Sequence, residues 1–391
     1  MDFELWWLLG IPAFFALGWI AARVDIRQLV SESRTLPRGY FKGLNHLLNE
    51  QPDKAIDSFI EIVKLDPETV ELHFALGNLF RRRGETERAI RVHQNLLARP
   101  DLPLEERAHA EYELGQDYLK AGLLDRAEET YKRLIGSSYE VQARRALLEI
   151  FQREKEWERA IEAAVALQEA GAGNRQKEIS QFYCELAQDA LVRMHPEDAM
   201  PLLDKAVQAD RSSVRATILV GDVQLAQGDV AGALATWRRV EHQSVPHTAL
   251  LAQRLMDGYR KLGKPEEGVS LLKSYLEQAS SIDLLEVVFK AVLELDGVEA
   301  AKQLVVDELR RTPTLLGLDK LLEARMMDAP AGVVSELSLV QNLVHSYTTR
   351  LARYQCGHCG FKARQFYWHC PGCSRWDSYP PRRSEELNVM N

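Results

Sequence analysis

A spaced triplet of small residues occurs three times along this chain and restricts it to one kind of fold. The stretch from Ala75 to Leu97 reads ALGNLFRRRGETERAIRVHQNLL. Gaps of seven and five residues separate the members of each triplet, which are Gly77, Gly84 and Ala89; Gly115, Gly122 and Ala127; and Gly221, Gly228 and Ala233. We expect the first glycine to admit a close neighbour and the second to end a helix with left-handed backbone. The pattern therefore predicts paired helices with a period near 34 residues, which is the length of a tetratricopeptide repeat.

Weaker versions of the same pattern fill residues 40–312, which we interpret as the repeat array. The remaining units are marked by Gly43, Ala55, Phe59 and Pro67; Phe151, Trp157, Ala160 and Leu167; Ala187, Ala199, Leu203 and Ala206; Tyr259, Gly263, Gly268 and Leu272; and Ala300 with Leu304. Large aromatic residues at repeat positions are interpreted as packing residues, namely Phe59, Phe80, Tyr118, Tyr131, Trp237 and Tyr259. Two further helices, near Leu315–Met327 and Val333–Thr349, break the period, and we expect residues 313–350 to cap the array or to dock on another element.

A stack of helix pairs forms one continuous core and a curved superhelix whose concave surface usually holds a segment of another protein. The basic cluster of Arg81, Arg82, Arg83, Arg88 and Arg91 is interpreted as a solvated polar face, in preference to a site for an acidic partner or an anionic lipid. Cys184, which lies in a predicted helix beside Tyr183 and Leu186, is interpreted as a small buried thiol.

The first 22 residues contain an uncharged apolar run from Leu5 to Ala22, LWWLLGIPAFFALGWIAA. As a helix this run would span about 27 Å, close to the thickness of a bilayer's hydrocarbon core. Acidic residues precede it and arginines follow it, so the positive-inside rule places the rest of the chain in the cytoplasm. A cleaved signal peptide would need a basic start, and a buried core helix is the other alternative. We expect residues 1–22 to be a transmembrane anchor and residues 23–39 a juxtamembrane linker.

Residues 351–380 carry the most specific motif in the chain. The sequence YQCGHCGFKARQFYWHCPGCSRWDSY has two C-x-x-C pairs, separated by ten residues. Such pairs can place four thiolates around one metal ion, which predicts that Cys356, Cys359, Cys370 and Cys373 are the ligands. Reduced thiols or a redox pair are the alternative, and four cysteines do not distinguish iron from zinc. A module this short has little core, so we expect the metal to hold it together.

Composition limits the function classes. The chain has 391 residues, of which 27% are charged, and a formal net charge of −8, which argues against binding to nucleic acid. We find no phosphate-binding G-x-x-x-x-G-K, no G-x-S-x-G and no H-E-x-x-H motif, and a saturated four-thiolate site has no open position for a substrate. We therefore expect no catalytic residues and no enzymatic activity.

The order of these features, an anchor, a helical repeat array and a CGHCG…CPGC pair, resembles the lipopolysaccharide assembly protein B (LapB) family. The stretches GNLFRRRGETERAIRVHQ, QFYCELA and YQCGHCGFKARQFYWHCPGCSRW are similar to that family. The resemblance implies an all-α tetratricopeptide-repeat superhelix with one transmembrane helix and a small rubredoxin-like metal-binding module at residues 351–380, followed by a tail at 381–391. The second cysteine pair differs from rubredoxins because Ser374 stands where a glycine often follows.

The resemblance also implies a function and partners. Proteins of this family are single-pass proteins of the inner membrane that face the cytoplasm. They act as adaptors between the membrane protease FtsH and the deacetylase that commits material to lipid A, and an inner-membrane regulatory protein restrains them. A scaffold for an envelope-biogenesis complex and a rubredoxin-type electron-transfer protein are the alternatives. An oligomer is compatible with a chain of this kind.

Overall fold

The computed structural model describes residues 51–65 and 69–389, together with Trp19 and, between 42 and 49, Lys42, Gly43, Asn45, His46, Leu48 and Asn49. Apart from Trp19, the expected anchor at 1–22 and the linker at 23–39 lie outside the described residues, as do Pro67 of the first repeat and the last two residues of the tail. Within the described ranges, no helix has both the length and the apolar character needed to cross a membrane. The chain separates into two compact units, residues 1–150 and 151–391.

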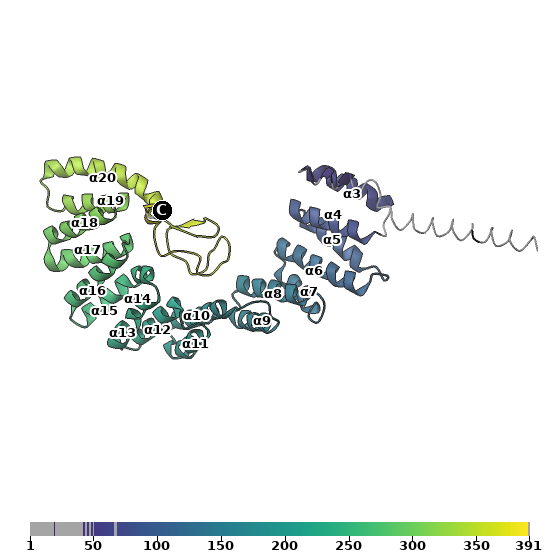
Figure 1. The fold of residues 1–391 in the computed structure, drawn as a ribbon, viewed down its shortest axis with the longest axis horizontal. Coiled ribbons are helices and arrows are strands. Elements are labelled where there is room, and N and C mark those ends of the chain that lie inside the picture. The colour runs from purple at the N-terminus through teal and green to yellow at the C-terminus, as the bar shows by residue number, and fades with distance from the viewer. Residues whose placement is uncertain are drawn as a thin grey trace, which may run out of the picture. The chain divides into compact units, whose positions relative to one another are not determined.

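The first unit consists of antiparallel helix pairs (Figure 1). Its helices are α3 (Pro52–Leu65), α4 (Val70–Arg83), α5 (Thr86–Leu97), α6 (Leu104–Ala121), α7 (Leu124–Arg133) and the first part of α8 (Glu140–Glu154). The second unit continues the pattern with α9 (Trp157–Glu169), α10 (Gln176–Val192), α11 (Pro196–Ala209), α12 (Val214–Ala226), α13 (Val230–Arg238), α14 (Val240–Gln243), the 3-10 helix η2 (Val245–Leu251), α15 (Ala252–Lys261), α16 (Pro265–Gln278), α17 (Ile282–Asp296), α18 (Val298–Arg311), α19 (Leu315–Met326) and α20 (Ala331–Leu351). It ends with two short strands, β1 (Tyr354–Gln355) and β2 (Lys362–Ala363), and with α21 (Ser384–Val389).

The small-residue triplets lie at helix ends and at close helix contacts, as their spacing predicts. Gly84, Gly122 and Gly228 each follow the first helix of a pair with φ between +74° and +87°. The alanines that complete the triplets are fully buried. A Cβ added at Gly221 would lie 2.2 Å from Nε1 of Trp237, which stands four residues after Ala233. The first glycine therefore makes room for a large side chain from the second helix, and His93 and Tyr131 fill the equivalent places in the other two repeats.

Other sequence-based interpretations are confirmed with small changes. The six repeat aromatics are all buried, and so is Cys184, whose pKa burial raises to about 12. In the second helix of the last repeat, α18, the fully buried residues are Ala301 and Val305, one position after the predicted Ala300 and Leu304, which are half-buried. The turn is one residue shorter in this repeat, because α18 begins directly after Gly297, whereas one residue separates Gly84, Gly122 and Gly228 from the helix that follows each of them.

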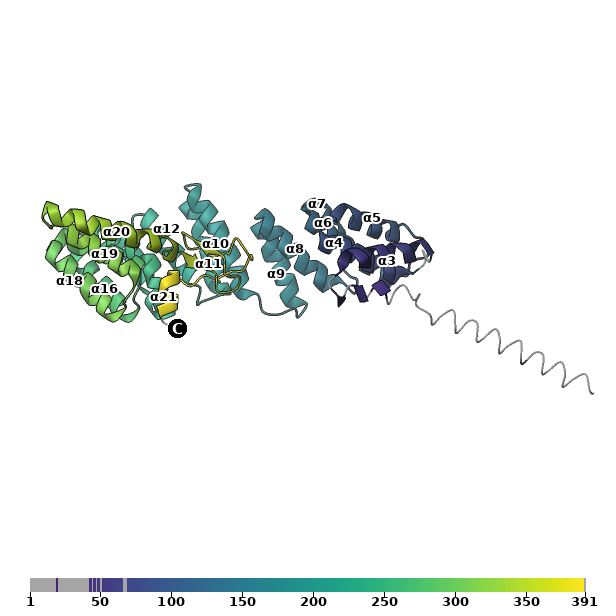
Figure 2. The same cartoon turned by 90° about the horizontal axis from the view of Figure 1, so that it is seen from above.

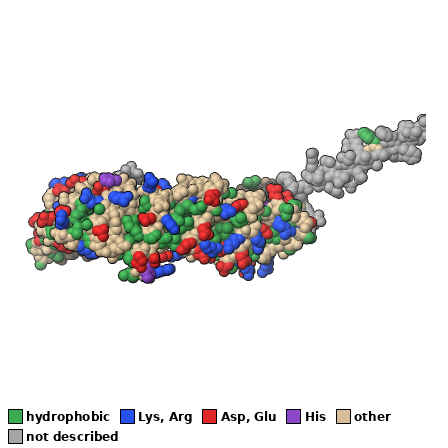
Figure 3. All heavy atoms as spheres, turned by 90° about the horizontal axis from the view of Figure 1, so that it is seen from below, with side chains coloured by type: hydrophobic (Ala, Val, Ile, Leu, Met, Phe, Trp, Pro, Cys, Tyr) green, Lys and Arg blue, Asp and Glu red, His purple; other side chains and the backbone are tan. Residues whose placement is uncertain are grey.

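The basic cluster on α4 and α5 is only partly a solvated face. Arg81 is half-buried and binds the carboxylates of Glu113 and Asp117, and Asp117 in turn lies 2.5 Å from Nδ1 of the fully buried His93. Arg83, Arg88 and Arg91 also pair with nearby carboxylates. The interpretation of the cluster as a solvated face is therefore wrong for Arg81, because its guanidinium links α4 to α6 through these two carboxylates. On the face seen in Figure 3, basic and acidic side chains are interspersed.

Candidate metal centre

The first cysteine pair forms a tight turn between β1 and β2, which pair antiparallel with Tyr354 opposite Ala363. The backbone N–H of Cys356 donates to Phe361 O at 2.9 Å, and that of Gly360 donates to Cys356 O at 3.0 Å. Gly360 takes φ +74°, where a glycine carries no steric cost. These bonds fold the two cysteines toward the same point.

The second pair repeats this turn with a different residue. The N–H of Cys370 donates to Arg375 O at 2.9 Å, and that of Ser374 donates to Cys370 O at 2.8 Å. Ser374 occupies the position of Gly360 and has φ +54°, although it is not a glycine. The departure noted in the sequence thus leaves the geometry intact, at a steric cost of about 1–2 kcal/mol.

The four thiols converge at one point. Their Sγ atoms all lie within 4.8 Å of one another. The Cys356 and Cys373 sulfurs are 3.8 Å apart, and those of Cys359 and Cys370 are 3.7 Å apart. A tetrahedral ion with metal–sulfur bonds of about 2.3 Å requires sulfur–sulfur edges of about 3.8 Å. The residues therefore fit one metal ion in a four-cysteine site, and among the described residues no histidine joins this cluster.

When all four thiols are ionised, their electrostatics favour a cation between them. Burial opposes ionisation of Cys356, but hydrogen bonds from Ser378 and from the backbone N–H groups of Cys359 and His358 lower the pKa of its thiol to about 6. Burial and the neighbouring thiols raise the pKa of Cys373 to about 12. Four thiolates at these distances repel one another strongly unless a positive ion lies between them.

Trp376 anchors this module to the first helices of the second unit. Its ring lies edge-on to Trp157 and Phe182, with centroids 6.0 and 5.8 Å away, and it stacks on His369 at 4.4 Å. Its Nε1–H donates to Oε1 of Gln152 at 3.1 Å. The indole thus fills an apolar recess and satisfies its single donor there.

A polar network surrounds the same contact. Arg215, only 4% exposed, places its guanidinium 5.8 Å from the centre of the Trp376 ring and donates to Gln181 and Glu185. Gln181 donates in turn to both carboxylate oxygens of Asp377, at 3.0 and 3.1 Å. The segment QFYCELA, which contains Gln181, Phe182 and Glu185, is therefore part of the surface that holds the module.

Aromatic residues form a second contact, further along the array. The ring of Trp368 stacks on His247 of η2 with an interplanar angle of 5° and a centroid distance of 5.7 Å. Phe366 packs edge-on against Trp368 at 4.9 Å. Burial lowers the pKa of His247 to about 4, so this ring is neutral at physiological pH.

The tail supplies a third contact. Arg383 binds Asp283, with Nη2 2.6 Å from Oδ1, and its guanidinium lies 4.1 Å from the centre of the Tyr354 ring. The carboxylate of Glu386 accepts from the N–H of Ile282 at 2.5 Å, and that of Glu385 accepts from Leu315 at 2.5 Å and from Leu316 at 3.0 Å. Two tail carboxylates therefore cap the N-termini of α17 and α19, where helix dipoles favour negative charge.

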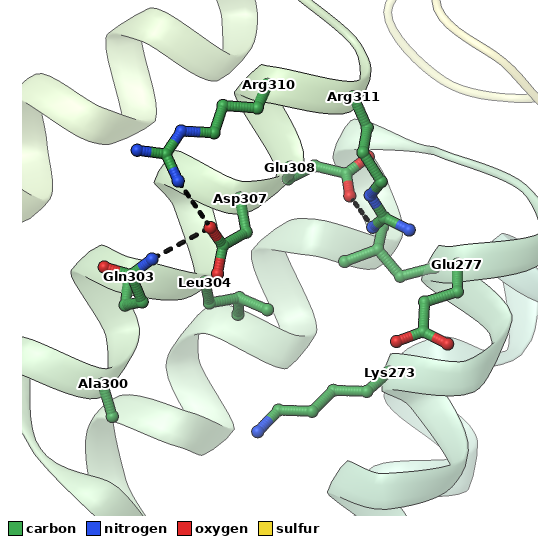
Figure 4. Close-up of a pocket in the computed structure, with 10 residues that line it drawn as sticks. Lys273, Glu277, Ala300, Gln303, Leu304, Asp307, Glu308, Arg310 and Arg311 are labelled. Atoms are coloured by element: carbon green, nitrogen blue, oxygen red, sulfur yellow. Dashed lines mark hydrogen bonds and ion pairs between the residues drawn. The ribbon is translucent and has the colours of Figure 1, made fainter.

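Among the hollows in the described part of the second unit, two differ clearly in size and lining. The larger, about 890 Å³, lies between α16 and α18 (Figure 4), and several of its charged lining residues pair with each other, such as Arg310 with Asp307 and Arg311 with Glu308. The smaller, about 420 Å³, lies where the module meets the repeats and is lined by apolar, aromatic and charged side chains, among them Leu191, Arg215, Asp222, Arg254, Phe366 and Trp368.

Comparison with known proteins agrees with these features. Residues 354–380 match the family described as a rubredoxin metal binding domain, and residues 72–108, 112–175 and 184–244 match tetratricopeptide repeat families. The chain is 38% identical over 384 residues to "Lipopolysaccharide assembly protein B" of Escherichia coli (strain K12), covering 97% of this chain and 98% of that protein. It is 30% identical to the protein of the same name in Haemophilus influenzae, covering 98% and 100%. A solved structure, "Structure of Naa15/Naa10 bound to HypK-THB", aligns with 74% of this chain and 45% of its own, at 16% identity and a TM-score of 0.41.

Proposed function

This chain belongs to the lipopolysaccharide assembly protein B family, and we propose that it is a cytoplasmic adaptor anchored in the inner membrane. In this proposal it regulates lipopolysaccharide synthesis by presenting the committed-step deacetylase of the lipid A pathway to an FtsH-type membrane protease. An inner-membrane regulatory protein controls how much of the adaptor is available. The name of the relatives supports a role in lipopolysaccharide assembly. The identities of the partners, which are the protease, the deacetylase and the regulatory protein, are what we propose.

The observation that carries an adaptor role is the joint surface of the metal module and the repeats. The 420 Å³ hollow takes lining residues from α10, α12 and η2 and also takes Phe366 and Trp368 from the module. Apolar and aromatic walls with a few charged groups suit a segment of another protein. Because the metal holds Phe366 and Trp368 in place, we propose that Cys356, Cys359, Cys370 and Cys373 serve recognition by shaping this hollow.

The same site argues for a function without catalysis. Four thiolates complete a tetrahedral coordination sphere and leave no position for a substrate. The ion, iron or zinc, then contributes folding free energy to a module that has little core of its own. We therefore propose that the chain has no catalytic residues and acts through binding alone.

We also propose that residues 1–22 are a membrane anchor and that residues 23–39 link it to the array at 40–312. The apolar run Leu5–Ala22 and the arginines after it support an orientation with the array in the cytoplasm. Confinement beside a membrane protease raises the effective concentration of the adaptor, to about millimolar for short flexible linkers.

The test is the half-life of the deacetylase in cells that carry a chain without residues 1–22 at native abundance. We expect the array to fold, since its core lies outside this segment, and the deacetylase to be degraded more slowly than with the full chain. Degradation at the full rate would refute the tethering role. A variant with Cys356→Ser and Cys359→Ser, on the intact anchor, separates loss of the recognition surface from loss of the tether.

A further inference from the structure

A short segment of the tail, residues 383–386, binds the metal module, the end of α20 and the starts of α17 and α19. Figure 2 shows α21, which begins at Ser384, against the helices of its own unit. Both the backbone N–H and the hydroxyl of Ser384 donate to Arg353 O, at 2.7 and 2.6 Å. Ser384, Glu385 and Glu386 are 5%, 8% and 5% exposed. Glutamates are rarely buried this deeply unless they are paired, so the segment has a defined place in the fold.

Arg383 is the residue of this segment that reaches the module. Its guanidinium donates to Arg364 O at 2.9 Å and lies 4.1 Å from the centre of the Tyr354 ring. It also binds Asp283 of α17, whose Oδ2 accepts from the hydroxyl of Tyr354 at 2.6 Å. We call Arg383, Asp283 and Tyr354 the arginine clamp. The side chains of Arg383 and Asp283 are 18% and 25% exposed, so water and salt screen their attraction only in part.

The arginine clamp touches the wall of the 420 Å³ hollow. The ring of Tyr354 lies edge-on to that of Phe366 with centroids 5.8 Å apart, and Phe366 lies edge-on to Trp368 at 4.9 Å. Phe366 and Trp368 both line the hollow. Arg364, whose carbonyl accepts from Arg383, stands two residues before Phe366. Arg383 is therefore connected to the aromatic wall by two routes, one through rings and one through the backbone.

We propose that Arg383 is a positioning residue, which holds Phe366 and Trp368 where they form the wall of the hollow. The inference rests on the proposed role of the hollow in recognition and gives the tail a part in it. Without the guanidinium, the Tyr354 ring and the Arg364 carbonyl each lose a partner, so the segment that leads into Phe366 is no longer fixed.

The other contact of the module is independent of the arginine clamp. Trp376 bonds to Gln152 of α8 and packs against Trp157 of α9 and Phe182 of α10. Loss of Arg383 should therefore move the wall and leave the Trp376 contact and the four-cysteine site in place. A purely structural role of the tail would instead loosen the whole module.

Fluorine NMR of the full chain, solubilised in detergent and labelled with 5-fluorotryptophan, tests this positioning. We expect Arg383→Gln to shift and broaden the Trp368 signal, and to leave the Trp376 signal and the metal content unchanged. Trp368→Phe assigns the signal. Arg364→Gln is the matched control, since it removes the same charge from an exposed side chain of the module that does not line the hollow, and it should leave both signals unchanged.

Asp283→Asn opens the arginine clamp from the side of the array and does not depend on a change in the tail. We expect it to shift the Trp368 signal in the same direction as Arg383→Gln. The combined variant should shift it no further than Arg383→Gln alone, because both substitutions act on the same contact. A Trp368 signal that Arg383→Gln leaves unchanged would overturn the proposal, and so would an equal change in the Trp376 signal.

The affinity for the purified deacetylase of the lipid A pathway separates this inference from the proposed function. We expect Phe366→Ala, which removes part of the wall, and Arg383→Gln, which displaces it, each to weaken binding about tenfold. Binding that Phe366→Ala leaves intact would contradict the proposed role of the hollow, while the Trp368 signal would still decide whether Arg383 positions the wall. Binding that Phe366→Ala weakens and Arg383→Gln does not would contradict the positioning role.

Discussion

Replacing Trp376 by alanine should weaken the docking of the metal module on the repeats while leaving the metal bound. Trp376 lies outside the four-cysteine cluster, and its ring contacts Trp157, Phe182 and His369. Its Nε1–H bonds to Gln152 at 3.1 Å. The substitution therefore removes docking contacts and leaves every thiol in place.

The magnitude follows from these contacts. The two edge-on ring pairs with Trp157 and Phe182 contribute about 0.5–1.5 kcal/mol each, and the hydrogen bond to Gln152 contributes a similar amount. The guanidinium of Arg215 above the ring adds about 0.5–1 kcal/mol. Since the indole is half-buried, we expect Trp376→Ala to lower the free energy of undocking by about 3 kcal/mol, which is roughly a hundredfold in the undocked population.

Amide hydrogen exchange measures this population directly. In Trp376→Ala the amides of residues 354–380 that the docked module protects should exchange about a hundredfold faster, with one metal ion per chain retained. Trp376→Phe keeps the ring contacts and loses only the hydrogen bond, so it should cost about 1 kcal/mol, as should Gln152→Ala. Unchanged exchange in Trp376→Ala would refute the reasoning, because the module would then be held without this contact.

Four further predictions concern the metal, pH and packing. Cys370→Ser should release the metal and unfold the module, seen as metal loss by elemental analysis and loss of aromatic circular dichroism. Since the pKa of His247 is about 4 in the fold and near 6.5 when unfolded, the contribution of this side chain to stability decreases as pH falls below 6.5, by about 2 kcal/mol at pH 5; His247→Phe should remove this contribution from the pH dependence of thermal melts. Burial raises the pKa of Glu386 to about 7 from an ordinary 4.5, because it outweighs the hydrogen bonds from the backbone N–H groups of Arg383 and Ile282, which favour the charged form. The stability contributed by the protonated form is therefore lost as pH rises from 4.5 through 7, and Glu386→Gln should stabilise the chain at pH 8 in denaturant titrations. Gly221→Ala should destabilise by about 1–3 kcal/mol in the same titrations, because the new Cβ meets Trp237 at 2.2 Å.

Matched control variants, and the results that would contradict each assignment, accompany these predictions. Cys184→Ser alters a buried thiol outside the metal site and should keep the metal, so metal loss there would contradict the assignment of the ligands. Gly228→Ala has open space around its Cβ but φ +87°, so it should cost about 1 kcal/mol, less than Gly221→Ala. A pH profile that His247→Phe or Glu386→Gln leaves unchanged would refute the corresponding assignment.

The repeats and the cysteine turns could be predicted because their signals are local. Gly77 and His93 are 16 residues apart, and the cysteine ligands lie within 18 consecutive residues, so spacing alone defines the contacts. Where a repeat departs from the pattern, as at Ala301, the buried residue lies one position later than the sequence predicts. These are features in which short-range geometry determines the structure.

The docking surface could not be predicted in the same way. Trp376 meets Gln152 across 224 residues of sequence, and Arg383 meets Asp283 across 100. Neither pair belongs to a periodic pattern. The hydrogen-bond donors of a tryptophan or an arginine in this part of the chain could find acceptors at many places, so the sequence does not identify the partner. Glu385 and Glu386 resemble an ordinary acidic tail until the structure places them at the N-termini of α17 and α19.

Cross-linking mass spectrometry on intact cells tests most directly whether this chain acts by holding other proteins at the cytoplasmic side of the membrane. Our account predicts cross-links from the repeats and from residues 354–380 to a membrane-bound protease and to the lipid A pathway deacetylase. Those to the deacetylase should be lost when Cys356 and Cys359 are both replaced by serine. Cross-links of the repeats to periplasmic proteins alone would contradict the account, because the partners and the reduced thiols would then lie on opposite sides of the membrane.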